Sequence, residues 1–167
     1  LLERASVLFV LGNADRSVIE LAARLQDPGA EATPRERWLV EQHDASMRDL
    51  LAAFPAAIEL EVEGVGDVLC CHGSPRSDEE LVTVETPERR LAEAVVGTSA
   101  GVIATAHTHV GYSRRVLGRT FFNPGSVGFA YRHHQPEEHF RADPWAGIAL
   151  IAYAAETVAD TRMVRVG

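Results

Sequence analysis

Polar residues that can bind metals or phosphates follow four short apolar runs of the sequence. The runs cover 7–11, 68–71, 102–106 and 120–122, and the polar residues just beyond them are Asn13, His72, His107, His109, Asn123 and Ser126. In a layered α/β domain, functional groups gather on the loops at one end of the strands. We therefore predict that the four strand ends form one shared polar site.

The pair His107 and His109 is the strongest single indication of a metal site. In an extended segment, side chains two residues apart point to the same face, and their Cα atoms lie ~6.5–7 Å apart. One imidazole can then bind one metal ion while the other binds a second ion ~3.5–4 Å away. The pattern predicts a site for two metal ions, although a chain with seven histidines can also contain such a pair by chance.

Several of these residues also have a purely structural interpretation. Asn13 could be the N-cap of the helix that follows it, and Asp15 is better explained as a cap or first-turn acid than as a ligand. His72 could be a turn histidine, and the run 123–126 is by composition a turn. The joint presence of all four fragments favours a shared site over these separate explanations.

Composition limits the class of protein. A chain of 167 residues, 46% hydrophobic, can bury one substantial core, so a single domain over 1–167 is expected. The net charge of −8 argues against a nucleic-acid surface, which needs clustered Lys and Arg. It leaves a phosphate substrate possible, because bound divalent ions reverse the local field. No apolar run approaches the ~18 residues of a membrane helix, so no membrane partner is expected.

The two cysteines, Cys70 and Cys71, are adjacent in the sequence. Neighbouring residues of a strand point to opposite faces, so a disulfide between them would be strained. We expect reduced core thiols without a catalytic role, in a protein located in the cytoplasm.

The periodicity predicts an α/β first half and a mostly β second half. Helices are expected over 15–25, 33–43, 45–54 and 86–97, and strands over 7–11, 58–62, 68–71, 102–106, 113–117, 119–123, 147–153 and 158–165. Thr33 and Glu36 form a capping-box pattern with Pro34 at the first helical position. Two packed sheets flanked by helices is the architecture that this order favours.

The fragments Gly-Asn-Ala-Asp, His-Gly-Ser-Pro, Ala-His-Thr-His-Val-Gly and Asn-Pro-Gly-Ser-Val-Gly resemble, in order and spacing, the later motifs of the calcineurin-like metallophosphoesterase superfamily. They are most similar to its small bacterial phosphodiesterase branch, and the likeness runs from Leu8 onward. The resemblance implies the metallophosphatase fold, a four-layer α/β/β/α sandwich of two mixed β-sheets flanked by helices. Here that fold would lack its N-terminal βαβ portion.

The resemblance also implies ligands and an activity. Asn13, His72 and His107 would bind one divalent ion, and His109 would contribute to a second. The ions would be Mn, Fe, Zn or Ni. The implied reaction is hydrolysis of phosphate esters, foremost phosphodiesters, by a metal-bridging hydroxide that attacks phosphorus in line. A small phosphate ester or a nucleotide-like molecule would be the substrate.

The chain departs from the family pattern at three places. The Asp-x-His motif and the bridging Asp of a Gly-Asp motif should precede Asn13, but the twelve residues before it contain neither Asp nor His. Ala14 stands where a histidine that assists the leaving group often follows the asparagine, and Ala106 replaces a glycine. Because the chain also begins with Leu rather than Met, we expect an upstream segment of roughly 50–70 residues, about one βαβ unit.

The missing carboxylates affect the expected metal content. The four implied ligands are all neutral, whereas two neighbouring divalent ions need anionic ligands to offset their repulsion. The second site, left with His109, is expected to be empty or weak. We expect this chain alone to be inactive and the protein from which it derives to be a hydrolase.

Two classes of function remain open. One is a metal-dependent phosphoesterase, and the other is a non-catalytic protein-binding scaffold of the same fold, as in the retromer subunit that resembles these enzymes. A scaffold has no need of all four implied ligands, which favours the enzyme.

Three residues are further candidates for substrate binding. Arg76, in the rim after His72, could contact a phosphate, and Asn123 and Ser126 could contact the substrate from the last motif. The histidine-rich loop with His133, His134 and His139 is explained most simply as a solvated loop. A substrate-side or metal contact is the alternative.

Overall fold

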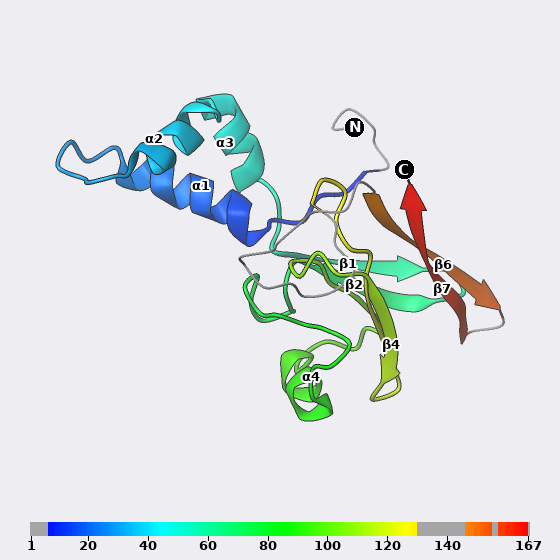
Figure 1. Ribbon diagram of the computed structural model, residues 1–167. Coiled ribbons are helices and arrows are strands. Elements are labelled where there is room, and N and C mark those ends of the chain that lie inside the picture. Colours follow the sequence, from blue (N-terminus) through cyan, green and yellow to red (C-terminus); the bar gives the residue numbers. More distant parts are fainter. Residues whose placement is uncertain (1–6, 130–145, 155–156, 167) are drawn as a thin grey trace. The chain divides into compact units, whose positions relative to one another are not determined.

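The computed structural model describes residues 7–129, 146–154 and 157–166, and it divides into two compact units, Leu1–Ala56 and Ala57–Gly167 (Figure 1). Each unit is described by itself, so the expected single domain over 1–167 stays a prediction. In the part of the chain that is described, no helix is long and apolar enough to cross a membrane.

The described residues of the first unit, 7–56, form three helices. They are α1 (Asn13–Arg24), α2 (Pro34–Glu41) and α3 (Ala45–Ala52), and the predicted helices are confirmed with slightly different ends. Helix α1 buries Val18 and Ala22 and contacts both other helices. The predicted capping box of α2 is confirmed, because the Glu36 amide donates to Thr33 Oγ1 at 3.2 Å and the Thr33 amide donates to Glu36 Oε2 at 2.7 Å.

The predicted strand over 7–11 is wrong. This segment is irregular: the Leu11 amide donates to the Pro55 carbonyl at 2.9 Å, and the Phe9 ring stacks on Phe54 with centroids 5.0 Å apart. A β-branched run favours a strand only where a neighbouring strand supplies a ladder. Here the contacts are made with the end of the helical unit instead.

The second unit is built on a five-stranded mixed sheet of order β1-β2-β3-β5-β4. The strands are β1 (Ala57–Val62), β2 (Gly66–Cys71), β3 (Val102–Ala104), β4 (Tyr112–Val116) and β5 (Arg119–Asn123). The three central strands β2, β3 and β5 are parallel, while β1 and β4 run antiparallel to their neighbours at the edges. The five strands predicted for this region are confirmed, although β3 ends two residues earlier than expected, at Ala104.

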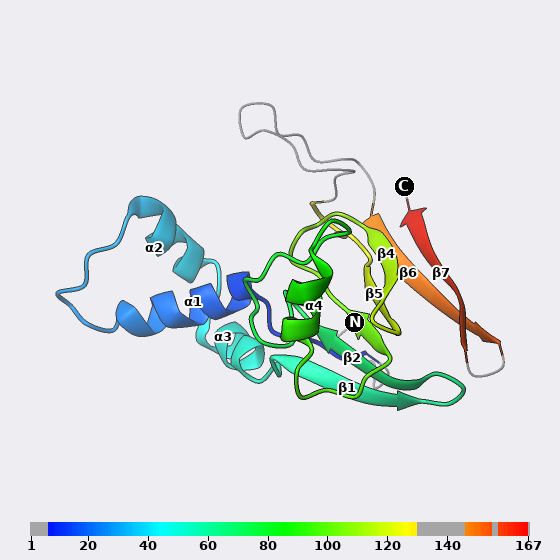
Figure 2. The same ribbon diagram turned by 90° about the horizontal axis from the view of Figure 1, so that it is seen from below.

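The last two strands, β6 (Ala146–Ala154) and β7 (Thr157–Val166), form an antiparallel pair, seen beside the larger sheet in Figure 2. Both predicted strands are confirmed. Within the described residues this second sheet is antiparallel rather than mixed.

The core covers both faces of the five-stranded sheet. Leu69, Ile103 and Phe121 are in register across the central strands and pack against Leu91 and Val95, which belong to helix α4 (Glu88–Ala94) and its C-cap. The alternate residues Val68, Val102 and Phe122 point to the other face and pack with Ala149 of β6. Alternation along each strand therefore produces a helix, a sheet and a second sheet in layers, in agreement with the predicted α/β sandwich class.

Candidate metal centre

The three central strands bring polar residues to one edge of the sheet. Strands β2, β3 and β5 are parallel, with Cys70 opposite Ala104 and Ala104 opposite Phe122. The carboxyl ends of adjacent parallel strands lie at the same edge. The segments that carry His72, His107 and Asn123 therefore start from this common edge.

His72 and His107 lie next to each other. Their ring centroids are 5.1 Å apart with an interplanar angle of 60°, and the Ala106 amide donates to the His72 carbonyl at 2.6 Å. Two imidazoles that share a tetrahedral ion at metal–nitrogen distances of ~2.0–2.1 Å have ring centroids about 5 Å apart. The separation of the two rings therefore suits a shared divalent ion.

The segment that carries His107 and His109 is not extended, so the geometry expected from their spacing is wrong. The backbone of His107 has φ 63° and that of His109 has φ 60°, and the Thr108 amide donates to the Ala106 carbonyl at 2.7 Å. A bond between residues two apart around a positive φ is a classic γ-turn, which is rare and strained. The turn follows the hydrogen bond from the Ala106 amide to the His72 carbonyl, which links Ala106 to the segment after β2.

His109 is oriented by a backbone carbonyl. Its Nδ1 lies 3.0 Å from the Phe129 carbonyl oxygen, and the two rings meet edge to face with centroids 5.7 Å apart. A carbonyl only accepts hydrogen bonds, so Nδ1 carries the proton and the lone pair is on Nε2. Metal-binding histidines are commonly oriented in this way by a carbonyl or carboxylate.

The set of donors is incomplete for a metal ion. Over the described ranges, no group of three or more His, Cys, Asp or Glu side chains is placed to hold an ion. His72 and His107 form a pair, and Asn13 belongs to the other compact unit. The convergence of Asn13 with this pair and the assignment of His109 to a second ion stay predictions. The two imidazoles fit an ion that accepts nitrogen ligands but supply no negative charge.

Asn13 is the first residue of α1, and Gly12 occupies the N-cap position. The alternative in which Asn13 is the N-cap is therefore wrong. The structural interpretation of Asp15 is confirmed, because the Gly12 amide donates to Asp15 Oδ2 at 3.0 Å. Ala14, where a histidine was expected from the resemblance, is exposed in the first turn of the helix.

Asn123 has a structural role that sequence reasoning missed. Its side chain is fully buried (0% exposed) and donates through Nδ2 to the Ala106 carbonyl at 2.5 Å and to Thr108 Oγ1 at 3.0 Å. Its Oδ1 accepts from the Gly125 amide at 2.8 Å. Asn123 has no exposed surface in this structure, and a substrate contact by Asn123 stays a prediction. The Asn-Pro-Gly turn was the signal for this role.

Ser126 follows the same turn. Its Oγ accepts from the Phe129 amide at 3.1 Å, and its carbonyl accepts from the Gly147 amide of β6 at 2.8 Å. A substrate contact by Ser126 stays a prediction. The histidines His133, His134 and His139 lie outside the described residues.

The guanidinium of Arg76 is bound by a carboxylate. Arg76 donates to both oxygens of Glu80, at 2.8 and 2.5 Å, and Arg90 donates to Glu80 at 3.1 Å. The hydrogen bonds from Arg76 are the main cause that lowers the pKa of Glu80 to about 2. A phosphate would have to compete with Glu80 for Arg76, so the phosphate contact stays a prediction.

The cysteines are free thiols, with Cys70 half-buried and Cys71 buried. Burial raises the pKa of Cys71 to about 12 and also raises the pKa of Cys70. A thiol that stays protonated is a poor nucleophile and metal ligand, so the expected structural role is supported. The cytoplasmic location stays a prediction.

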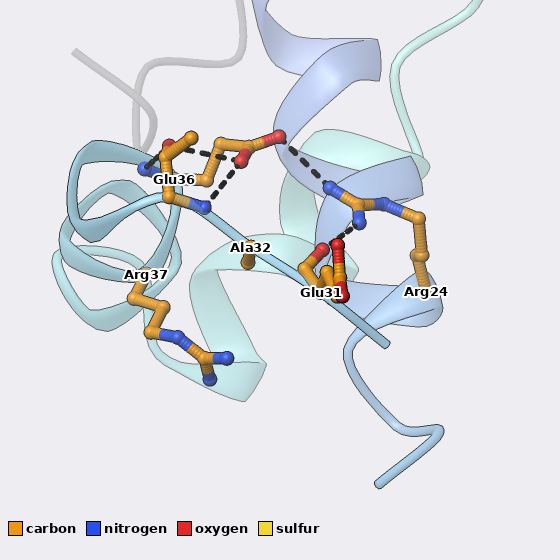
Figure 3. A pocket seen from close by; sticks show the side chains of 6 residues that line it. Arg24, Glu31, Ala32, Glu36 and Arg37 are labelled. Atoms are coloured by element: carbon orange, nitrogen blue, oxygen red, sulfur yellow. Dashed lines mark hydrogen bonds and ion pairs between the residues drawn. The ribbon is translucent and has the colours of Figure 1, made fainter. Parts of the chain in front are cut away.

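A shallow pocket lies in the helical unit between the end of α1 and the start of α2 (Figure 3). Its residues are Arg24, Glu31, Ala32, Thr33, Glu36 and Arg37. Arg24 donates to Glu36 Oε1 at 2.8 Å and to the Glu31 carbonyl. These contacts, together with those between Thr33 and Glu36, stabilise the helix connection, so the pocket is not assigned a ligand.

Comparison with known proteins identifies the family to which the chain belongs. The model of the calcineurin-like phosphoesterase superfamily domain matches residues 1–143. A hypothetical protein from Pyrococcus horikoshii has a similar structure, with a TM-score of 0.68 at 17% identity over 99% of this chain and 65% of that one. A metallophosphoesterase from Sphaerobacter thermophilus has a TM-score of 0.62 at 22% identity over 95% of this chain and 65% of that one.

These similarities show a shared fold, the α/β metallophosphoesterase fold that the sequence predicted. The chain spans 65% of the length of each of these two proteins. No protein with a curated description matches it.

Proposed function

The chain belongs to the calcineurin-like phosphoesterase superfamily, and we propose that the protein containing it hydrolyses phosphate esters, with phosphodiesters as its preferred substrates. The observation that carries this proposal is the pair His72 and His107, with ring centroids 5.1 Å apart beyond adjacent parallel strands. Asn13 is proposed as the third ligand of the same ion. The substrate is proposed to be a small or nucleotide-like phosphate ester.

A bound divalent ion would supply Lewis acidity and an activated water nucleophile. The residues of this chain would bind that ion. His72 and His107 offer two nitrogen donors, and Asn13 would add an amide oxygen. This mixed set of nitrogen and oxygen ligands suits Mn, Fe, Zn or Ni.

His109 is proposed to bind a second ion. The contact of its Nδ1 with the Phe129 carbonyl places the lone pair on Nε2, which is the atom that would bind. A second ion beside the first needs anionic ligands as well. Since the described residues contain no group of three or more His, Cys, Asp or Glu side chains placed to hold an ion, we propose that the second site is weak in the chain by itself.

The alternative function is a non-catalytic scaffold. Hydrolysis of bis(4-nitrophenyl) phosphate by the protein that contains this chain separates the two. An enzyme should be faster with added Mn²⁺ or Ni²⁺ and should lose its activity with EDTA. His107→Ala should lower the rate by roughly 10²–10³-fold, because metal ligands supply most of the charge stabilisation.

His43→Ala is the matched control for that variant. His43 is a histidine of the helical unit whose Nδ1 lies 2.9 Å from the Leu39 carbonyl, outside the candidate metal centre. Its replacement should leave the rate and the metal dependence unchanged. Hydrolysis that is equal with and without chelator, or equal in both variants, would reject the proposed metal-dependent reaction.

A further inference from the structure

Asn123 contacts the chain on both sides of His107. Its Nδ2 donates to the carbonyl of Ala106, the residue before His107, and to the side chain of Thr108, the residue after it. We infer that Asn123 is a positioning residue that holds the His107 imidazole in the orientation needed to bind a metal ion. This inference rests on the proposed function, in which His107 is a ligand.

The turn at His107 needs such support. Its φ of 63° is uncommon for a residue with a side chain. Strained backbone of this kind persists only where the surrounding structure holds it. The Thr108 amide already bonds to the Ala106 carbonyl, and Asn123 adds a second donor to the same carbonyl. The orientation of the His107 side chain follows from this turn, because φ sets the direction of its Cα–Cβ bond.

Asn123 is itself held on rigid structure. It is the last residue of β5, it lies opposite Tyr112 of β4, and its side chain has no exposed surface. Its remaining side-chain atom, Oδ1, accepts from the Gly125 amide in an Asx-type turn. Gly125 has φ 89°, which favours glycine. Two of these three hydrogen bonds therefore connect the loop that carries His107 to the end of β5, and the third lies within the turn that follows β5.

The acceptor on Thr108 provides a test that leaves Asn123 in place. Thr108→Val removes one hydrogen bond to Asn123 at nearly constant side-chain volume, while Thr108→Ser keeps the hydroxyl. Thr86→Val is the matched control, because Thr86 is buried to the same degree (7% against 8% exposed). Its Oγ1 likewise accepts a short hydrogen bond, from the Thr83 amide at 2.8 Å, away from the histidines.

Two measurements on the protein that contains this chain give the readout. The first is the affinity for Co²⁺, with the absorption spectrum of the cobalt-loaded protein. Thr108→Val should weaken binding about tenfold, the order expected for one hydrogen bond, and should change the spectrum. Thr108→Ser should resemble the wild type. Thr86→Val should lower the unfolding midpoint as much as Thr108→Val does, but keep the affinity and the spectrum.

The second measurement is the NMR position of the His107 ring resonances in metal-free protein. Thr108→Val should shift them, whereas Thr86→Val should not. Asn123→Ala should produce a larger change of the same kind, and if it fails to fold, the threonine variants still decide.

The outcomes separate the inference from the proposed function. Equal cobalt affinities and unshifted ring resonances in Thr108→Val would overturn the positioning role while leaving the metal site intact. A wild-type protein that binds no cobalt would overturn the metal site. The ring resonances would then still show whether Asn123 and Thr108 orient His107.

Discussion

The imidazole rings of His72 and His107 lie 5.1 Å apart, although they follow two different strands. Their separation follows from the parallel pairing of β2 with β3, which places Cys70 opposite Ala104. The hydrogen bond from the Ala106 amide to the His72 carbonyl continues this pairing beyond the strands. The geometry of the candidate metal centre is therefore tied to the register of the sheet.

If the two histidines share one ion, their replacements should not act independently. His72→Ala and His107→Ala should each lower the affinity for Mn²⁺ or Zn²⁺ by at least about 100-fold, since even residues that only orient a ligand cost 10–100-fold. The double variant should be little weaker than either single variant, because the shared site is already lost. Isothermal titration calorimetry measures all three affinities. Fully additive effects would argue for separate sites.

Gly73, directly after His72, has no room for a side chain. A Cβ at this position would lie 2.6 Å from the Ser77 carbonyl oxygen and 2.8 Å from that of Glu80. Gly73→Ala should therefore displace the loop backbone and lower the free energy of unfolding by about 2–3 kcal/mol. Urea unfolding provides the measurement. Gly101→Ala is the control, because a Cβ there meets no atom within 4 Å, and it should change stability by much less.

The ion pairs of Glu80 should make stability depend on pH in the acid range. The hydrogen bonds from Arg76 lower the pKa of Glu80 from 4.5 to about 2 in the folded protein. The ionised form is thus favoured by folding, so this stabilisation is complete above about pH 4.5 and is lost as the pH falls towards 2.

Glu80→Gln should lower the free energy of unfolding by roughly 1–3 kcal/mol at pH 7, because Glu80 is only 10% exposed and its hydrogen bonds are charge-assisted. The difference from the wild type should shrink between pH 4.5 and pH 2. Glu63→Gln, in the exposed turn between β1 and β2, is the control and should leave the free energy of unfolding at pH 7 nearly unchanged. A Glu80→Gln effect that is constant with pH would contradict the role of the carboxylate charge.

Cys71 should react slowly with thiol reagents in the folded protein. Burial raises its pKa to about 12, so the thiolate fraction at pH 8 is very small. Iodoacetamide labelling, followed by mass spectrometry, should modify Cys71 in urea but not under native conditions. Blocking the accessible thiols should leave phosphoesterase activity unchanged. Rapid native labelling of Cys71 would contradict its burial.

Ala14 should limit the range of substrates. Without an imidazole next to Asn13, this motif cannot protonate a poor leaving group, so esters with acidic leaving groups should be preferred over alkyl phosphates. Because Ala14 is exposed at the start of α1, a larger side chain can be accommodated. Ala14→His in the protein that contains this chain should accelerate poor leaving groups by up to ~10²-fold, the low end for positioned acid catalysis.

To test Ala14→His, the rate of hydrolysis is measured for a series of esters with different leaving groups. The variant and the wild type are compared at saturating metal. Activated nitrophenyl esters should change little, because they need no protonation. If the rates of the two proteins depend on the leaving group in the same way, the residue at position 14 does not act as a general acid.

Much of the local structure could be predicted from the sequence. The capping box of Thr33 and Glu36, the helix that buries Leu91, and the strands of the second unit follow from patterns that act within a few residues. The segment 7–11 shows the limit of such patterns. Its apolar, partly β-branched sequence is typical of a strand, but the segment is irregular because no neighbouring strand pairs with it. The spacing of His107 and His109 predicted an extended segment. The structure has a γ-turn there instead, which residue spacing alone does not indicate.

By itself the sequence determined the order of the elements, the faces that alternation buries, and the motifs that place the chain in its superfamily. Each of these depends on residue types and on spacing along the chain. Only the tertiary structure decided that His72 and His107 are neighbours, that Glu80 binds Arg76 and Arg90 together, and that Asn123 is buried against the His107 turn. These contacts depend on strand register and on hydrogen bonds between distant segments, which the free energy of the whole fold selects and no local pattern encodes.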